Sequence, residues 1–184
     1  PLRLEMGPQS ALVALDVRTR QVLAVVGNYE AVTGGLDRAT QTRRQPGSTF
    51  KPVVYSYALH SRRFTPATLV EARSGTIDGY HPMNFEEVDG NEPIRLREAL
   101  AKSVNVAAVH VAQQVGPANI VEWGHSLGIT GKLGADLSLA LGAYEVPPVE
   151  MANAYATFAS GGMTEAPKFI VKIVDSQGKE LELP

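Results

Sequence analysis

The sequence predicts an α+β fold, and three observations support that prediction. Hairpin-like patterns occur near both ends of the 184-residue chain, helical patterns fill the middle, and strands do not alternate with helices. The predicted order is two strands, one helix, a long irregular segment, three helices, a further helix and two strands. A parallel sheet would need alternating strands and helices, so this order favours α+β over a parallel repeat.

The first hairpin is predicted from two apolar, β-branched runs, residues 10–17 and 21–26, which are separated by the polar turn 18–20. Gly27 and Asn28 end the second run, as turn residues commonly do. The polar, mixed segment 29–45 then predicts a loop that leads to the first helix.

The first helix is expected to begin at about Gly47 or Ser48, after a Pro-Gly pair, and to run to about residue 59 or 60. Ser48 and Lys51 then stand at i and i+3, on one face of the helix and within reach of each other. The first-turn N–H groups have no partner within the helix and carry the positive end of its dipole, so they favour a developing oxyanion. The stretch therefore predicts a nucleophile beside a base.

Ser-x-x-Lys spacing alone is a weak signal. Ser176 and Lys179 repeat it in what is predicted to be a hairpin turn. Serine is also a common helix-capping residue, and lysine is usually a solvated side chain. A plain helix cap at Ser48 therefore remains open at this point.

The irregular segment 61–93 contains Gly, Pro, Asp and Asn at short intervals, and long segments of this kind often line a site. Helices are predicted at 96–102 and 106–115, with Ser103-Val104-Asn105 as a polar interruption between them. A further helix is expected at 117–127, because it begins with proline and is followed by glycine.

The last helix is predicted at 147–160, where Met151, Ala154, Tyr155 and Phe158 follow helical spacing. The larger side chains Tyr144, Met151, Tyr155 and Phe158 are interpreted as core and not as a ligand site. Runs at 168–174 and 179–183 flank a polar turn and predict a second hairpin.

Composition excludes several classes of function. The chain contains no cysteine, which rules out disulfides, thiol catalysis and cysteine-bound zinc, and its net charge of −2 gives no electrostatic case for nucleic acid. The four histidines lack metal-ligand spacing, and Gly131-Lys132 lacks the glycine and hydroxyl of a phosphate-binding loop. No apolar run is long enough to predict a membrane span.

Ser103 and Asn105 lie two residues apart, so both polar groups can point into one cleft. Taken alone, they are interpreted as caps of the following helix. Together with Ser48 and Lys51, they provide a serine nucleophile, an amine base, a second hydroxyl to relay a proton and an amide to hold a carbonyl. That is a full set for acyl transfer.

These motifs resemble the transpeptidase family of the penicillin-binding proteins, the bifunctional class A members above all. Ser-x-x-Lys is followed by Ser-x-Asn about 55 residues later, in the family's order. The sequence around these motifs also resembles the family, and the resemblance covers nearly the whole chain. It is carried by RATQTRRQPGSTFKPVVY, TPATLV, LREALAKSVNVAAV and LSLALGAYEVPPVEMANAYATFASGG.

The resemblance implies a penicillin-binding or serine β-lactamase-like fold and a role for each residue. Ser48 would be acylated, Lys51 would take its proton, Ser103 would relay that proton, and Asn105 would bind the acyl-side amide of the substrate. The Ser48 N–H would form half of an oxyanion hole. The implied substrates are peptidoglycan stem peptides ending in D-Ala-D-Ala, with β-lactams as covalent inhibitors and no cofactor or metal.

The third motif of the family, Lys-Thr-Gly on a strand that lines the cleft, does not occur in this sequence. Thr130-Gly131-Lys132 has the letters reversed and comes too early. The chain is therefore expected to be the N-terminal part of a transpeptidase domain, whose remainder would come from another segment. A glycosyltransferase domain and a membrane anchor are expected upstream, with the enzyme outside the cytoplasmic membrane. The first hairpin would then lack sheet neighbours and expose an edge.

Two other classes of function compete with the transpeptidase. A serine β-lactamase or β-lactam sensor would share the chemistry of Ser48 and Lys51, although the sequences RRQPGSTFKP and LGAYEVPPVEMA favour the transpeptidase. A non-catalytic fragment would keep the fold without turnover, because the Lys-Thr-Gly motif is missing.

Overall fold

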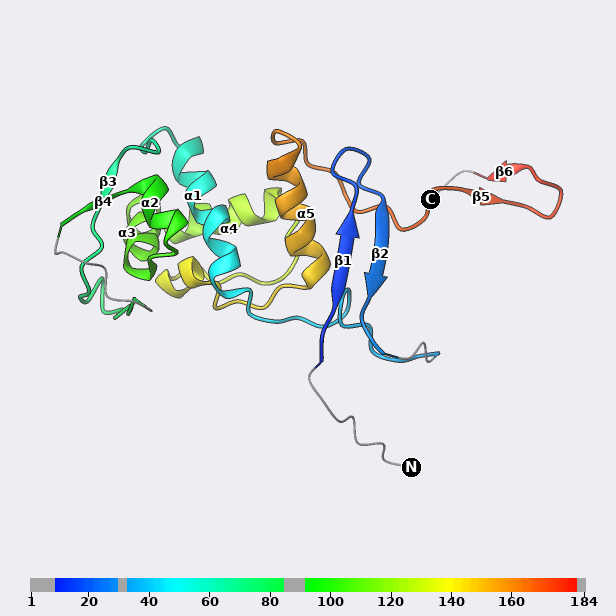
Figure 1. Cartoon of the computed structure of the whole chain (residues 1–184), viewed down its shortest axis with the longest axis horizontal. Coiled ribbons are helices and arrows are strands. Elements are labelled where there is room, and N and C mark those ends of the chain that lie inside the picture. Colours follow the sequence, from blue (N-terminus) through cyan, green and yellow to red (C-terminus); the bar gives the residue numbers. More distant parts are fainter. Residues whose placement is uncertain (1–8, 30–32, 85–91, 182–184) are drawn as a thin grey trace, which may run out of the picture. The chain divides into compact units, whose positions relative to one another are not determined.

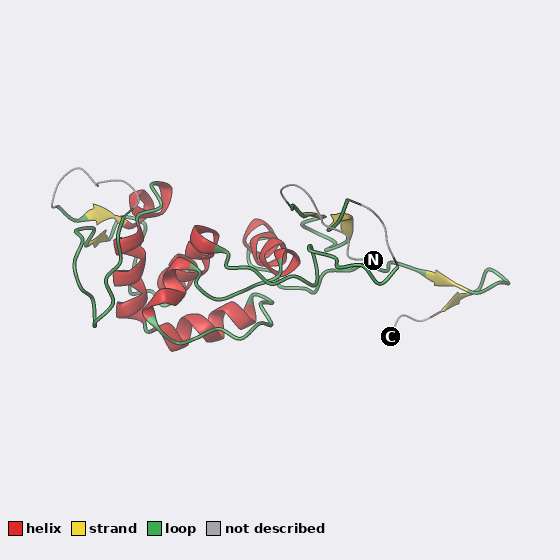
Figure 2. Cartoon of the chain, turned by 90° about the horizontal axis from the view of Figure 1, so that it is seen from below, coloured by secondary structure: helices red, strands yellow, loops and turns green. Residues whose placement is uncertain are grey.

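The structure, a computed structural model, describes residues 9–29, 33–84 and 92–181. The chain divides into two compact units, residues 44–146 and residues 1–43 with 147–184, which are described in turn. The helices lie mainly in the first of these, and the long hairpin lies in the second (Figures 1 and 2). The predicted α+β class is confirmed.

The helical unit starts with a short 3₁₀ turn that leads directly into the first α-helix. Its elements are η1 (Gly47–Phe50), α1 (Lys51–His60), α2 (Leu96–Ala101), α3 (Asn105–Val115), α4 (Pro117–Ser126) and η2 (Leu137–Leu141). The predicted helices are all present, and their ends differ from the predicted ones by four residues or fewer. Proline at the first position of α4 fits the helix start, as the sequence predicted.

The core of this unit forms where α1 packs against α3 and α4. Phe50, Val53 and Val54 are fully buried, as are Val109 of α3 and Ile120 of α4. Each such side chain contributes about 1.5–3 kcal/mol through burial. Because α1 is buried along most of its length, packing holds the residues at its N-terminus in a fixed position.

The first turn differs from the predicted α-helix start. Residues 47–50 form a 3₁₀ helix, in which the Lys51 N–H donates to the Ser48 carbonyl oxygen, and the α-helix begins only at Lys51. A 3₁₀ helix has about three residues per turn, so residues at i and i+3 lie directly above one another. The tighter turn therefore keeps Ser48 and Lys51 on one face.

Two short strands were not predicted from the sequence. Within and just after the irregular segment, β3 (Leu69–Val70) pairs in antiparallel register with β4 (Ile94–Arg95), which leads straight into α2. Strands of two residues are too short for a period-two pattern to show. Residues 85–91 of this segment lie outside the described ranges.

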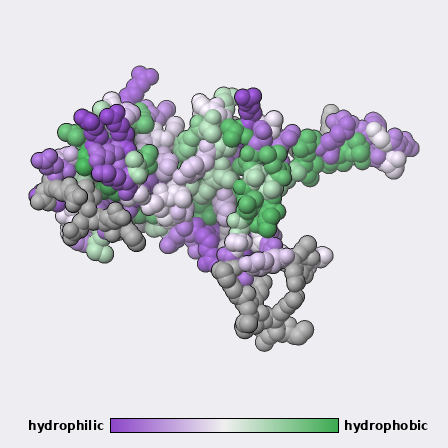
Figure 3. Space-filling view, viewed as in Figure 1, coloured by the Kyte–Doolittle hydropathy of each residue, from purple (hydrophilic) through white to green (hydrophobic). Residues whose placement is uncertain are grey.

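The other unit contains the predicted N-terminal hairpin, β1 (Leu12–Leu15) and β2 (Val22–Val26), which pair antiparallel with Leu12 opposite Val26. Among the described residues, no further strand continues this sheet. Leu23 is 65% exposed, and Figure 3 shows hydrophobic surface over this region. The predicted exposed edge is confirmed for the described residues except at the start of β2, where the Lys168 backbone bonds to Arg20 and Val22.

The turn of this hairpin is built around Arg20, which has a positive φ of 59°. Its side chain is buried, and Nη2 donates to Ser160 Oγ at 2.9 Å and to the Met163 carbonyl oxygen. Ser160 is the C-cap of α5 (Pro148–Ala159), which packs against β1. The guanidinium therefore ties the hairpin turn to the end of that helix.

The interpretation of α5 as having its aromatic residues in the core is wrong for Tyr155, which is 41% exposed. The buried face of the helix instead runs through Val149, Asn153, Ala156 and Thr157. This helix has apolar residues on most sides, so periodicity alone could not select the face that packs.

The predicted C-terminal hairpin is present but shorter, with β5 (Ile173–Val174) pairing with β6 (Glu180–Leu181). Residues 168–171 are not a regular strand, although Lys168 makes one parallel bridge to Gln21. Both strands are mostly exposed, so burial contributes little to holding this hairpin together.

Candidate active site

The approach to Ser48 depends on two glycines with left-handed backbone conformations. Gly47 has φ 58° and Gly142, which ends η2, has φ 68°. The Gly47 N–H donates to the Gly142 carbonyl at 3.3 Å, and a Cβ on Gly142 would lie only 2.3 Å from the Gly47 carbonyl oxygen. No side chain fits at Gly142, so this contact fixes the turn that presents Ser48.

Lys51 is almost completely buried, with 1% of its surface exposed. Its Nζ donates to the Ser103 carbonyl oxygen at 2.6 Å, to Ser103 Oγ at 3.0 Å and to Asn105 Oδ1 at 2.6 Å. An ammonium has three N–H donors, and these neutral oxygens accept all three. Ser103 and Asn105, the predicted polar pair, therefore both contact Lys51, the predicted base.

Burial lowers the pKa of Lys51 from its ordinary value of 10.5 to about 8. The charged form is disfavoured because it loses the solvation that water provides. A pKa of about 8 leaves roughly a tenth of the amine neutral at pH 7. The buried lysine can therefore accept a proton near neutral pH, as a general base must.

Ser103 lies in the turn that ends α2. Its N–H donates to the Leu100 carbonyl at 3.0 Å, and the Val104 N–H donates to the Ala99 carbonyl at 2.9 Å. These two bonds form a Schellman motif, whose left-handed position usually holds glycine. Ser103 occupies it with φ 52°, at a cost of about 1 kcal/mol, and so places a hydroxyl beside the amine.

Asn105 is the first residue of α3, and its two amide atoms have different partners. Oδ1 accepts from Lys51, while Nδ2 donates to the Met83 carbonyl oxygen at 2.8 Å. The interpretation of Asn105 as a plain cap is wrong, because the cap position is Val104 and no side chain of residues 103–105 caps α3. Instead, Asn84 Oδ1 accepts from the Val106 N–H at 3.0 Å.

Ser48 is exposed at the surface of η1, three residues before Lys51. Within the described part of the chain, Ser48 Oγ makes no hydrogen bond to Lys51 Nζ or to any other group, and the Ser48 N–H donates to no backbone carbonyl. The structure thus assembles Lys51, Ser103 and Asn105 into one network and leaves the hydroxyl of Ser48 available to a reactant.

The sequence did not predict the contributions of Met83 and Asn84. Both belong to the irregular segment, which has no periodicity from which a contact could be read. The general expectation that this segment lines a site is nevertheless supported, since it contacts Asn105 and the start of α3.

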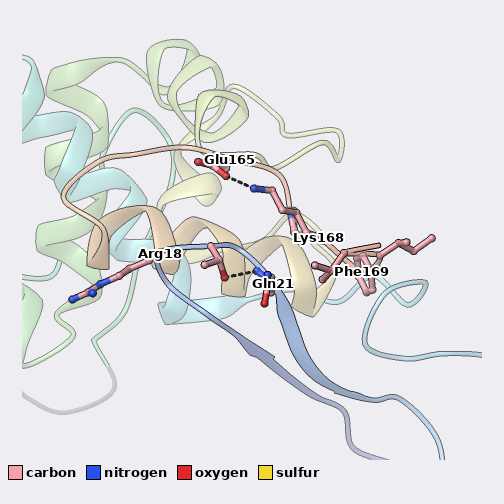
Figure 4. A pocket seen from close by; sticks show the side chains of 9 residues that line it. Arg18, Gln21, Glu165, Lys168 and Phe169 are labelled. Carbon is pink, nitrogen blue, oxygen red and sulfur yellow. Dashed lines mark hydrogen bonds and ion pairs between the residues drawn. The ribbon is translucent and has the colours of Figure 1, made fainter. Parts of the chain in front are cut away.

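A hollow in the other unit differs chemically from this site (Figure 4). It is lined by Arg18, Gln21, Lys168, Phe169 and their neighbours, and Lys168 forms an ion pair with Glu165 at 2.9 Å. It holds no buried amine beside a hydroxyl. The arrangement suited to acyl transfer is therefore the one around Lys51.

The described residues contain no group of three or more His, Cys, Asp or Glu side chains that could hold a metal ion. None of the helices in the described ranges is long and apolar enough to cross a membrane.

Comparisons with known proteins show the family to which the chain belongs. The family model of the penicillin-binding protein transpeptidase domain matches residues 10–183. Penicillin-binding protein 2D of Bacillus subtilis is 40% identical over 179 residues, which are 94% of this chain and 26% of that protein. Penicillin-binding protein 1A of Aquifex aeolicus is 38% identical, over 95% of this chain and 24% of its own length.

Solved structures of penicillin-binding proteins also align with this chain. Penicillin-binding protein 1A of Haemophilus influenzae aligns with a TM-score of 0.83 at 34% identity, covering 96% of this chain and 27% of that one. PonA1 of Mycobacterium tuberculosis aligns with a TM-score of 0.84 at 28% identity, covering 94% and 47%. The chain spans about a quarter of the length of the curated relatives it matches. Over that span, the chain belongs to the transpeptidase domain family of the class A penicillin-binding proteins.

Proposed function

We propose that this chain carries the acylating residues of a serine D,D-transpeptidase that crosslinks peptidoglycan stem peptides. Ser48 Oγ attacks the carbonyl carbon of the penultimate D-Ala, the C–N bond to the terminal D-Ala breaks, and an ester forms on Ser48. The amine of a second stem peptide then takes the acyl group and frees the serine. The observation that carries the proposal is the buried amine of Lys51, held by Ser103 and Asn105 one helical turn from Ser48.

Each residue has a role that its contacts support. Neutral Lys51 takes the Ser48 proton, and Ser103 Oγ, at 3.0 Å from Nζ, passes a proton to the departing amine. The Asn105 Nδ2 group has two N–H donors, of which one is bound to Met83 and the other can hold a substrate carbonyl. The Ser48 N–H supplies half of an oxyanion hole.

Penicillin is proposed as a covalent inhibitor that acylates the same serine. PonA1 has been solved in complex with penicillin V, and it aligns with a TM-score of 0.83 over 94% of this chain. The relatives are also named for penicillin binding. Since β-lactams react with this family's nucleophilic serine, we expect a stable ester on Ser48.

The other domains of the protein and its location in the cell are proposed from the family resemblance. The chain would form part of a transpeptidase domain, with a glycosyltransferase domain and a membrane anchor upstream, and the rest of the transpeptidase domain would complete the cleft. The enzyme would then act in the periplasm, at the outer face of the cytoplasmic membrane, in cell-wall biogenesis and the control of cell shape.

Incubation of the chain with a labelled penicillin tests the proposal. The expected result is a mass increase of one penicillin, mapped to Ser48, absent in Ser48→Ala and unchanged in Ser176→Ala. Ser176 is the matched control, because it belongs to the other Ser-x-x-Lys sequence and is exposed as well. A parent chain that is folded but forms no adduct would contradict the proposal.

The lifetime of the adduct separates the transpeptidase from a β-lactamase. A transpeptidase holds the penicilloyl ester for minutes or longer, whereas release within seconds would indicate a β-lactamase.

The second candidate, a non-catalytic fragment, is favoured by one observation: no Lys-Thr-Gly occurs in the sequence. In the family this motif lines the opposite side of the cleft. A folded chain without the adduct would favour this candidate, and an adduct on the chain alone would show that the motif is not required for acylation.

A further inference from the structure

The side chain of Asn84 joins the irregular segment to the start of α3. Oδ1 accepts from the Val106 N–H at 3.0 Å, and Nδ2 donates to the Ala72 carbonyl at 3.1 Å. The N-terminal N–H groups of a helix have no partners within it, and α3 has no capping side chain at its own cap position. Asn84 supplies that cap from 22 residues away in the sequence.

The residue before Asn84 holds the amide of Asn105. The Met83 carbonyl accepts from Asn105 Nδ2 at 2.8 Å, while Asn105 Oδ1 accepts from Lys51 Nζ at 2.6 Å. The reverse orientation of this amide would point its N–H₂ group at the Lys51 donors and its carbonyl oxygen at the Met83 oxygen. Both contacts would be repulsive, so the position of the Met83 carbonyl determines which atom faces Lys51.

We propose that Asn84 is a positioning residue for the acylation site, which fixes the Met83 carbonyl and thereby turns the oxygen of the Asn105 amide toward Lys51. Two hydrogen bonds of its side chain hold the backbone at residue 84, one to the buried Ala72 and one to the start of α3. The carbonyl of residue 83 precedes that anchor directly, so it cannot turn away while both bonds are intact.

This inference deepens the proposed function, because it assigns Asn84 to the machinery around Lys51. The contacts themselves, however, involve no atom of Ser48. The effect of Asn84 on Lys51 can therefore be measured without any reaction.

The test is the pKa of Lys51, followed by NMR of lysine labelled with ¹³C at Cε. The Lys51 signal is identified by its loss in Lys51→Arg. Asn84→Ala removes both bonds, so the Asn105 oxygen is no longer held on the ammonium. Loss of an acceptor disfavours the charged amine, and the pKa of Lys51 should fall by about one unit.

The same substitution in an Asn105→Ala background decides whether Asn84 acts through Asn105. The expected result is no further change in the pKa of Lys51, because the amide that Asn84 orients is gone. An equal fall in both backgrounds would overturn the proposal, since Asn84 would then act by another route.

Asn119→Ala is the matched control for a merely structural effect. Asn119 Nδ2 donates to the Val115 carbonyl at 2.7 Å, so its loss removes one amide hydrogen bond from the same unit without touching Lys51. The melting temperature should fall, and the pKa of Lys51 should stay the same. If Asn84→Ala behaves in this way too, the proposal is wrong.

Asn84→Asp covers the case in which Asn84→Ala does not fold. A carboxylate still accepts from the Val106 N–H at a helix N-terminus, but it cannot donate to the Ala72 carbonyl, so one of the two bonds is lost. Asn105→Ala should then change the pKa of Lys51 less in Asn84→Asp than in the parent. An equal change in both would contradict the proposal. Because the titration needs no reaction at Ser48, its outcome is distinct from that of the penicillin experiment.

Discussion

Lys51 and Arg20 are both fully buried cations, and each is held by a serine hydroxyl and a backbone carbonyl. Neither forms an ion pair with a carboxylate among the described residues. They differ in whether the nitrogen can accept a proton. The pKa of Lys51 falls to about 8 on burial, so its neutral amine can be an acceptor, whereas a guanidinium has only N–H donors and no acceptor.

This difference shows that similar hydrogen bonding can serve two purposes. Lys51 can become a neutral amine and take a proton from Ser48, so its position serves chemistry. Arg20 can only donate, so it serves as a permanent tie between the β1–β2 turn and the end of α5. The comparison can be tested by substitutions that separate reactivity from stability.

The largest expected effect is the loss of acylation in Lys51→Met. Methionine fills a similar volume without a charge, so the fold should remain stable, but Ser48 has no base. General base catalysis contributes about 10²–10⁴-fold, and the rate of penicilloyl ester formation should fall by that factor. Stopped-flow or gel measurement of labelled penicillin would check it, and an unchanged rate would mean that Lys51 is not the base.

The second effect concerns stability and pH. Because the pKa of Lys51 is about 8 in the folded chain and 10.5 when unfolded, the unfolded chain binds more protons between these values. The free energy of unfolding should therefore rise with pH from about 8 to about 10.5, by up to about 3 kcal/mol, and stay flat below 8 as far as this group is concerned.

Urea unfolding of the parent chain and of Lys51→Met at pH 7, 8, 9 and 10 measures this rise. The difference between the two chains isolates Lys51, because both contain the same other lysines. Parallel curves would show that the amine is not perturbed by burial.

Arg20→Ala should lower stability by about 2 kcal/mol, because it removes the hydrogen bonds to Ser160 and Met163 from a charged donor. The rate of acylation of the folded fraction should not change. Differential scanning calorimetry and penicillin labelling measure the two quantities. A chain that lost acylation but kept its stability would reverse the roles assigned to the two cations.

The smallest change is expected from relieving backbone strain at Ser103. Ser103→Gly and Ser103→Ala both remove the hydroxyl, so they should slow acylation equally. Glycine adopts φ 52° without strain, and it should therefore be more stable than alanine by about 1 kcal/mol. Equal melting temperatures would contradict the assignment of strain to this turn.

The sequence could predict the parts of the site that depend on near neighbours. Ser48 and Lys51 are three residues apart, and Ser103 and Asn105 are two apart, so local geometry and a family resemblance were enough to pair them. The helices were also predictable, because proline and glycine mark their ends. The contact between Lys51 and Ser103 was inferred from the complementary chemistry of the two motifs and from the resemblance, because local geometry cannot pair residues that lie far apart in the chain.

Other features depend on tertiary structure and could not be predicted. The 3₁₀ turn at Ser48 depends on the contact between Gly47 and Gly142, which lie far apart in the sequence. The cap that Asn84 places on α3 comes from a segment without periodicity. The buried face of α5 depends on which side packs against β1, and the strands β3 and β4 are too short to show a pattern.

The pH dependence of acylation tests the central claim, that neutral Lys51 activates Ser48. The rate of labelled penicillin ester formation at Ser48 would be measured from pH 6 to 9.5 in the parent chain and in Lys51→Met. The rate of the parent should rise about tenfold per pH unit below pH 8 and level off above it, since only the neutral amine accepts a proton. A rate independent of pH in the parent, or the same curve in Lys51→Met, would contradict the claim.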